Sequence, residues 1–151
     1  MMMLEVSRRD FTKAYRKHYE SYKATQNKGV ADISRGLLLV YAVECGLKSY
    51  VMKMYSIEKW SELNINLRNT LESFEPHNIQ QLMNIAKITS FDFPSFKTRY
   101  GDTVNANTYH QFCRYAPPLD DRDTKINSKV KEYDLILQKI ARDLEGRLRI
   151  K

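Results

Sequence analysis

The chain has 151 residues, of which 42% are hydrophobic and 28% are charged, and both fractions are ordinary for a soluble globular domain. With 5 glycines, 4 prolines and 2 cysteines, the sequence excludes a collagen-like fibre, a low-complexity chain and a disulfide scaffold. The net charge of +7 favours an anionic partner such as nucleic acid, although such a charge also keeps proteins soluble.

The first predicted helix runs from about residue 7 to residue 27. Ser7 and Asp10 have the spacing of a capping box, with Asp10 in place of the usual Glu or Gln. Aromatic residues at helical spacing form one stripe: Phe11, Tyr15, Tyr19 and Tyr22. Basic residues lie beside it, and the candidates for nucleic-acid binding are Arg9, Lys13, Arg16, Lys17 and Lys23. Such a face either stacks on and neutralises an RNA strand, or is a buried aromatic stripe with solvated basic neighbours.

The second predicted helix runs from about residue 31 to residue 54. Residues 37–47 are apolar on almost all sides, which is typical of a central, buried helix. Glu44 and Lys48 lie four residues apart within it, in the Glu-before-Lys order that favours pairing. We expect a structural ion pair at the edge of the core, and the alternative is a polar group close to a dimer interface.

A third helix is predicted between Ser56, a candidate cap, and Phe74. A short fourth helix opens at Pro76 and continues to about Ile88. In both helices the apolar residues recur on one face: Trp60, Leu63, Leu67 and Leu71 in the third, and Ile79, Leu82, Met83 and Ala86 in the fourth.

Residues 89–107 are predicted to be irregular. Aromatic residues are frequent there, which indicates either a segment packed on the body or a functional loop: Phe91, Phe93, Phe96 and Tyr100. A short helix over residues 108–115 must end at Pro117 and Pro118, because proline cannot continue a helix.

The last predicted helix starts near Asp121 or Asp123 and continues to Leu148. Its apolar residues repeat with heptad spacing: Ile126, Val130, Tyr133, Leu137, Ile140 and Leu144. No strand alternation of convincing length occurs in the sequence. We therefore predict an all-α fold, an antiparallel four- to five-helix bundle, in one domain that spans residues 1–151. Because the heptad face is wide, we also expect a homodimer.

The longest apolar run, residues 37–43, is far shorter than the roughly 20 residues of a membrane span. The apolar residues 1–4 precede the first charges, whereas a signal peptide carries its positive charges first. We therefore expect a cytoplasmic protein with no membrane association, in which Cys45 and Cys113 are reduced thiols. The basic charge is uneven: residues 1–60 carry 11 basic and 6 acidic side chains, and residues 121–151 carry 9 and 6.

Three segments in this order resemble the HEPN superfamily of small helical prokaryotic proteins: Tyr41–Lys48, Pro76–Met83 and Arg114–Asp121. Arg99-Tyr100 competes with Arg114-Tyr115 for the Arg-Tyr element of the pattern. The resemblance covers about residues 33–148. It implies a dimeric four- to five-helix bundle, and either a metal-independent RNase of a toxin–antitoxin or phage-defence system or a non-catalytic relative.

Active HEPN proteins carry an arginine and, four to six residues later, a histidine near the start of the last long helix. Here Arg122 has the position of the arginine, but the spacing at which the histidine belongs offers Asn127, Ser128 or Lys129. Asn and Ser cannot exchange a proton near neutral pH as an imidazole does, so we expect the usual chemistry to be weak or absent. His110 and Arg114, which lie four apart on one helix, replace this pair in reverse order or form a surface pair.

These four residues are the candidate catalytic site. Arg122 lies in the first turn of the last helix, where a phosphate could bind, but the acids beside it favour simple capping of that helix. His110 and Cys113 could supply two metal ligands, yet a zinc site needs four, so we predict no metal and no cofactor. Two hypotheses remain: an RNA-binding HEPN-like protein, with or without RNase activity, or a non-catalytic adaptor for a larger protein partner encoded nearby.

Overall fold

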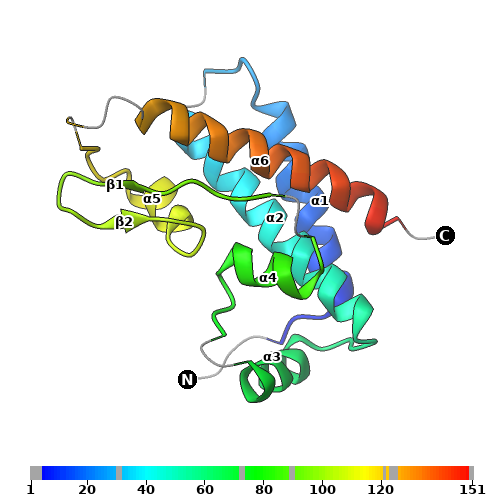
Figure 1. The fold of residues 1–151 in the computed structure, drawn as a ribbon. Coiled ribbons are helices and arrows are strands. Elements are labelled where there is room, and N and C mark those ends of the chain that lie inside the picture. The colour runs from blue at the N-terminus through cyan, green and yellow to red at the C-terminus, as the bar shows by residue number, and fades with distance from the viewer. Residues whose placement is uncertain are drawn as a thin grey trace.

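The computed structural model describes residues 5–29, 32–71, 74–88, 91–120, 122 and 126–149. These residues form six helices and one short hairpin (Figure 1). In chain order the elements are α1 Arg8–Ala24, α2 Asp32–Met54, α3 Trp60–Thr70, α4 Ile79–Ile85, β1 Phe96–Lys97, β2 Thr103–Val104, α5 Tyr109–Tyr115 and α6 Ile126–Arg147. The fold is therefore predominantly helical, as predicted. None of these helices combines the length and the apolar character that crossing a membrane requires.

Helix α2 is the centre of the molecule, because it packs against α1, α4, α5 and α6. Helices α1 and α2 are antiparallel: Arg35 at the start of α2 donates to the carbonyl of Tyr22 near the end of α1, at 2.9 Å. At the opposite ends, the hydroxyls of Thr12 and Ser49 lie 2.6 Å apart. Neighbouring helices thus cover the apolar surface on nearly all sides of α2, and the prediction of a central buried helix is confirmed.

Helix α6 runs in the same direction as α2, so the prediction of a purely antiparallel bundle is wrong in this respect (Figure 1). The hydroxyl of Tyr22 lies 3.3 Å from Asp134 in the first half of α6, and Arg147 at its end donates to Tyr50 in the last part of α2 at 2.9 Å. The reason is topological, since residues 55–120 carry the chain back to the start of α2. The heptad residues of α6 are buried, apart from a half-buried Val130.

Gly46 marks the closest approach of the three long helices. A Cβ atom at this position would lie 2.8 Å from a methyl carbon of Leu144 and 2.9 Å from the ring of Tyr15. The Tyr15 hydroxyl donates to the carbonyl of Ala141 at 2.6 Å, which ties α1 to α6 over the same spot. A side chain at position 46 would therefore push the helices apart.

The capping box at the start of α1 is confirmed. The Asp10 amide donates to the Ser7 hydroxyl at 3.1 Å, and the Ser7 amide donates to the Asp10 carboxylate at 3.0 Å. The aromatic stripe is part of the core, because Phe11, Tyr15 and Tyr22 are buried. The stacking role considered for this stripe is therefore wrong for these three rings.

The predicted starts of the third and fourth helices are wrong. Ser56 has a left-handed φ of 55° and caps nothing; α3 begins at Trp60, whose amide donates to the carbonyl of Val6 at 2.9 Å. Helix α4 begins after Asn78 rather than at Pro76, since the Asn78 side chain accepts from the amide of Gln81 at 3.2 Å. Tertiary contacts and a local cap thus set both boundaries.

The irregular segment contains a small antiparallel hairpin, β1–β2, in which Phe96 is opposite Val104. Strands of two residues are too short for sequence alternation to reveal, so the prediction missed them. Phe96 packs edge-on against Phe112 at 5.1 Å between ring centroids, which holds the hairpin on α5 as the aromatic composition predicted. Tyr100 at its tip is exposed. The predicted caps Asp121 and Asp123 lie outside the described residues.

Candidate functional site

A group of charged and titratable side chains gathers where α2, α4 and α5 meet. We call Glu44, Lys48, His77, His110 and Arg114 the histidine cluster. Glu44 lies at its centre: one carboxylate oxygen is 3.3 Å from the Lys48 ammonium, and the other is 2.9 Å from Nδ1 of His77. The side chains of Glu44 and Lys48 are only 12% and 7% exposed, so the predicted ion pair exists in a setting of low polarity.

The contacts of Glu44 fix the tautomer of His77. Burial by itself raises the pKa of Glu44, but the hydrogen bond from His77 and the charge of Lys48 outweigh it and hold that pKa below its ordinary value. Glu44 is therefore a carboxylate near neutral pH, and a carboxylate can only accept hydrogen bonds. Nδ1 of His77 must donate, so Nε2 is the nitrogen left for other partners. The His77 side chain is 61% exposed.

His110 lies beside His77, with 5.5 Å between the ring centroids. Burial, and next the charge of the neighbouring His77, lower the pKa of His110. Its imidazole is therefore neutral at pH 7 and can accept a proton. Sequence analysis placed His110 among the candidates but missed His77, although His77 stands in one of the three segments that carry the HEPN resemblance.

Arg114 is one turn beyond His110 on α5. Its Nη2 donates to the hydroxyl of Tyr41 in α2 at 2.7 Å, and its guanidinium lies 5.9 Å from the ring centre of Tyr115. Arg114 is exposed. The two residues predicted to face the same way thus both contact residues outside α5: His110 lies beside His77 in the segment before α4, and Arg114 bonds to Tyr41 in α2.

The described residues contain no group of three or more His, Cys, Asp or Glu side chains that could hold a metal ion. Cys113 is buried, and this burial raises the pKa of its thiol to about 12. Burial also raises the pKa of Cys45 to about 11. Both thiols are therefore protonated near neutral pH and are poor nucleophiles.

The second candidate site is a groove of about 520 Å³, which we call the basic groove. Its lining residues come from α1, the second half of α2, the turn before α3 and the end of the chain: Arg8, Arg9, Thr12, Lys13, Arg16, Ser49, Lys53, Glu58, Leu148 and Arg149. Six of them are cationic and one, Glu58, is anionic. Glu58 already pairs with Arg8 at 3.2 Å.

Three of the five predicted nucleic-acid-binding residues, Arg9, Lys13 and Arg16, line the basic groove. Lys23 does not line it; its ammonium lies 4.5 Å from the ring centre of Tyr19, beside a smaller cavity that Arg16 also lines. Lys17 is exposed on α1 and lines neither cavity. The remaining cations were missed because they come from other parts of the chain: Arg8, Lys53 and Arg149. The excess of basic residues at both ends of the sequence was the available signal.

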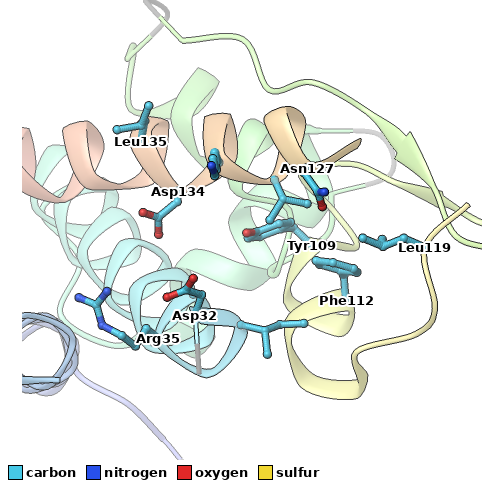
Figure 2. Close-up of a pocket in the computed structure, with 12 residues that line it drawn as sticks. Asp32, Arg35, Tyr109, Phe112, Leu119, Asn127, Asp134 and Leu135 are labelled. Atoms are coloured by element: carbon cyan, nitrogen blue, oxygen red, sulfur yellow. The ribbon is translucent and has the colours of Figure 1, made fainter. Parts of the chain in front are cut away.

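The other two catalytic candidates lie elsewhere. Arg122 is 90% exposed, and its guanidinium and its backbone amide both donate to Asp120. Asn127 lines a pocket of about 630 Å³ between α2, α5 and α6, together with Tyr109 and Asp134 (Figure 2). Arg122 and Asn127 therefore do not join His110 and Arg114 in one site.

Comparisons of this chain with known protein families, with curated proteins and with solved structures find no match.

Proposed function

We propose that this protein binds RNA through the basic groove. The observation that carries the proposal is the convergence of six cationic side chains on one groove, whose single carboxylate is already neutralised by Arg8. Cations held together in this way repel one another, and a phosphate backbone relieves that repulsion while it releases condensed counterions.

The extent of the basic surface favours a chain of phosphates over a single small anion. Arg16 and Arg149 line the basic groove and also the neighbouring cavity of about 240 Å³, which Lys23 reaches as well. The two cavities thus adjoin along α1, and the second one is lined by Glu20 and Glu145 as well as by its cations. The HEPN resemblance supports RNA as the polyanion, and membership of that superfamily stays a prediction.

The test is a fluorescence anisotropy titration with a labelled single-stranded RNA at several salt concentrations. Lys13→Ala and Arg16→Ala should weaken binding and flatten the plot of log affinity against log salt by about 0.7 for each phosphate that the variant no longer neutralises. Arg122→Ala is the matched control, because Arg122 is exposed but bonded to Asp120 outside the groove. Absence of binding at low salt, or equal slopes in all variants, would refute the proposal.

A non-catalytic adaptor is the second candidate function. A groove of about 430 Å³ between α3 and α4 favours it, because Tyr55 and Leu71 at its edge are exposed apolar residues.

The homodimer stays a prediction. The wide heptad face of α6, from which we predicted it, supports it less, because most of the heptad residues are buried within one chain. Light scattering should give twice the 17.8 kDa chain mass for a dimer, and Leu71→Glu would lower that mass if this groove is the interface.

A further inference from the structure

The two imidazoles of the histidine cluster lie at the separation that a shared metal ion requires. His77 and His110 come from different segments of the chain, and their ring centroids are 5.5 Å apart. With zinc–nitrogen bonds of about 2.1 Å in a tetrahedral arrangement, two imidazoles on one ion have ring centres roughly 5 Å apart. Small rotations of the two side chains are therefore enough to direct one nitrogen of each ring at the same ion.

Glu44 gives His77 the support that metal-binding histidines usually have. Its nearly buried carboxylate accepts from Nδ1 of the exposed His77 at 2.9 Å, so Nε2 is the nitrogen that can bind a ligand. A histidine that binds a metal through one nitrogen generally donates its other N–H to a carboxylate or a carbonyl, which fixes the ring and raises its basicity. The second oxygen of Glu44 lies 3.3 Å from the ammonium of Lys48, and this contact holds the carboxylate behind the ring.

His110 also presents one particular nitrogen. Its Nδ1 is buried and makes no well-formed hydrogen bond within the described part of the chain, although the backbone of Asn107 interacts with the ring. The residue as a whole is only half-buried, so the ring meets solvent at its opposite edge, which carries Nε2. Both imidazoles therefore keep Nδ1 on the protein side and leave Nε2 for a ligand at the surface.

Two imidazoles are fewer ligands than the four of a structural zinc site, and no third His, Cys, Asp or Glu side chain joins them within the described residues. The thiol of Cys113, which the sequence offers as a companion of His110, lies instead against Gly36 and Tyr109 in the core. A site of this kind is open, and water or an anion fills the remaining positions of the ion. Imidazole ligands suit Zn²⁺, Cu²⁺ and Ni²⁺, whereas Mg²⁺ prefers oxygen ligands.

We infer that His77 and His110 form an open binding site for a divalent transition-metal ion, with Glu44 as the residue that positions His77. The inference does not depend on RNA binding. It differs from the sequence prediction of no metal, because only the folded chain brings the two histidines together. An ion held by both rings ties the segment before α4 to α5, and an ion that binds only the folded chain stabilises it.

Arg114 opposes the binding of a cation at this place. Its guanidinium is held by the hydroxyl of Tyr41 at 2.7 Å, one turn beyond His110, and its charge reaches His110. Like charges repel, so the site should bind a metal ion less tightly than the two imidazoles alone would. Removal of the Arg114 charge should therefore tighten metal binding, which a site elsewhere in the molecule would not show.

The test is a calorimetric titration of the full chain, free of any histidine tag, with ZnCl₂ near neutral pH. The wild-type protein should bind one Zn²⁺ per chain and should not bind Mg²⁺. His77→Asn and His110→Asn should each abolish this binding, because a single imidazole remains. Glu44→Gln should weaken it by about 10- to 100-fold. His18→Asn, which removes the remaining histidine, is the matched control and should bind Zn²⁺ as wild type does.

Two further measurements separate ligation from effects on folding. Zn²⁺ should raise the melting temperature of the wild-type protein and leave that of a folded His77→Asn/His110→Asn variant unchanged. Nitrogen-15 NMR of the side chains should show Zn²⁺ shifting the Nε2 resonances of His77 and His110, and Arg114→Ala should bind Zn²⁺ more tightly than wild type. Absence of Zn²⁺ binding by the folded wild-type protein, or equal affinity in the double variant, would overturn the inference. Either result would leave the RNA-binding proposal untouched.

Discussion

The histidine cluster and the basic groove are both rich in charge, but they are built in opposite ways. In the cluster, Glu44 and Lys48 are nearly buried, and each charge depends on a partner within hydrogen-bond distance. In the groove, the side chains of Arg9, Lys13 and Arg16 are exposed and lie beside other cations. A buried charge is costly without its partner, whereas an exposed charge is screened by water and salt. Substitutions in the cluster should therefore affect folding, and those in the groove should affect mainly binding.

The largest expected effect is the loss of Glu44. Glu44→Ala leaves the ammonium of Lys48 buried without its carboxylate, which should lower the free energy of unfolding by about 3–5 kcal/mol. Urea denaturation followed by circular dichroism measures this change. Glu62→Ala, at an exposed position of α3, is the control and should stay within about 0.5 kcal/mol of wild type. An unchanged midpoint for Glu44→Ala would mean that water reaches Lys48 and that the cluster is not a buried site.

Replacement of both Glu44 and Lys48 by apolar residues tests whether the loss of stability comes from the unpaired charge. Glu44→Leu/Lys48→Met should recover most of the stability that Glu44→Ala loses, because an apolar pair needs no compensation. His77 would still lose its hydrogen-bond partner in this variant, so the recovered stability would come from the apolar pair and not from His77.

A smaller effect on stability is expected at Gly46, two residues after Glu44 on α2, where packing rather than charge is decisive. Gly46→Ala places a methyl group within 3 Å of Leu144 and Tyr15, and overpacking of this kind destabilises by about 1–3 kcal/mol. Gly146→Ala is the matched control, because nothing lies within 4 Å of the added atom and alanine favours helix. Thermal melts should therefore move in opposite directions for the two variants, and a shared direction would contradict this account of Gly46.

The long helices were predictable because their periodicity and their burial agree. The heptad spacing of α6 and the apolar surface of α2 both became core, and the Ser7 cap formed as expected. The start of α3 was not predictable, because it depends on the carbonyl of Val6, which only the folded chain brings near. The parallel direction of α2 and α6 was likewise not predictable, because it depends on the path of the whole segment that connects the two helices.

The candidate sites divide in the same way. The pairing of Glu44 and Lys48 was predictable from a spacing of four residues, because one helix presents both side chains on the same face. The meeting of His77 with His110 was not, since it joins segments 33 residues apart through packing on α2. The resemblance directed attention to Arg122, but local bonding to Asp120 keeps that side chain outside the cluster.

The cluster should also make stability dependent on pH. The pKa values of Glu44 and His110 are both lowered on folding, so the unfolded chain binds more protons and acid favours unfolding. Stability should begin to fall as pH drops through the ordinary His value of 6.5, and fall further below the ordinary Glu value of 4.5. For His110 the facing groups are His77, Glu44 and Arg114. Burial also lowers the pKa of His18 on folding, so His18 contributes to the decline in the same pH range. His110→Asn should therefore reduce the first part of the decline in melting temperature, and a decline that persists in full would assign it to His18 or to another group.

The smallest effect on folding is expected in the groove. Lys13→Ala removes an exposed charge that is surrounded by other cations, so the free energy of unfolding should change by less than about 0.5 kcal/mol. Lys13 is repelled by the other cations of the groove but attracts Asp10 on α1, so the two contributions oppose each other. Any change at low salt should vanish at about 1 M salt, where screening extends over only about 3 Å. Denaturation curves at the two salt concentrations measure this difference. A large loss of stability would show that Lys13 supports the fold, and its effect on RNA affinity could then no longer be assigned to phosphate contacts. The groove proposal therefore depends on a stable Lys13→Ala protein whose RNA affinity has nevertheless become weaker and less sensitive to salt.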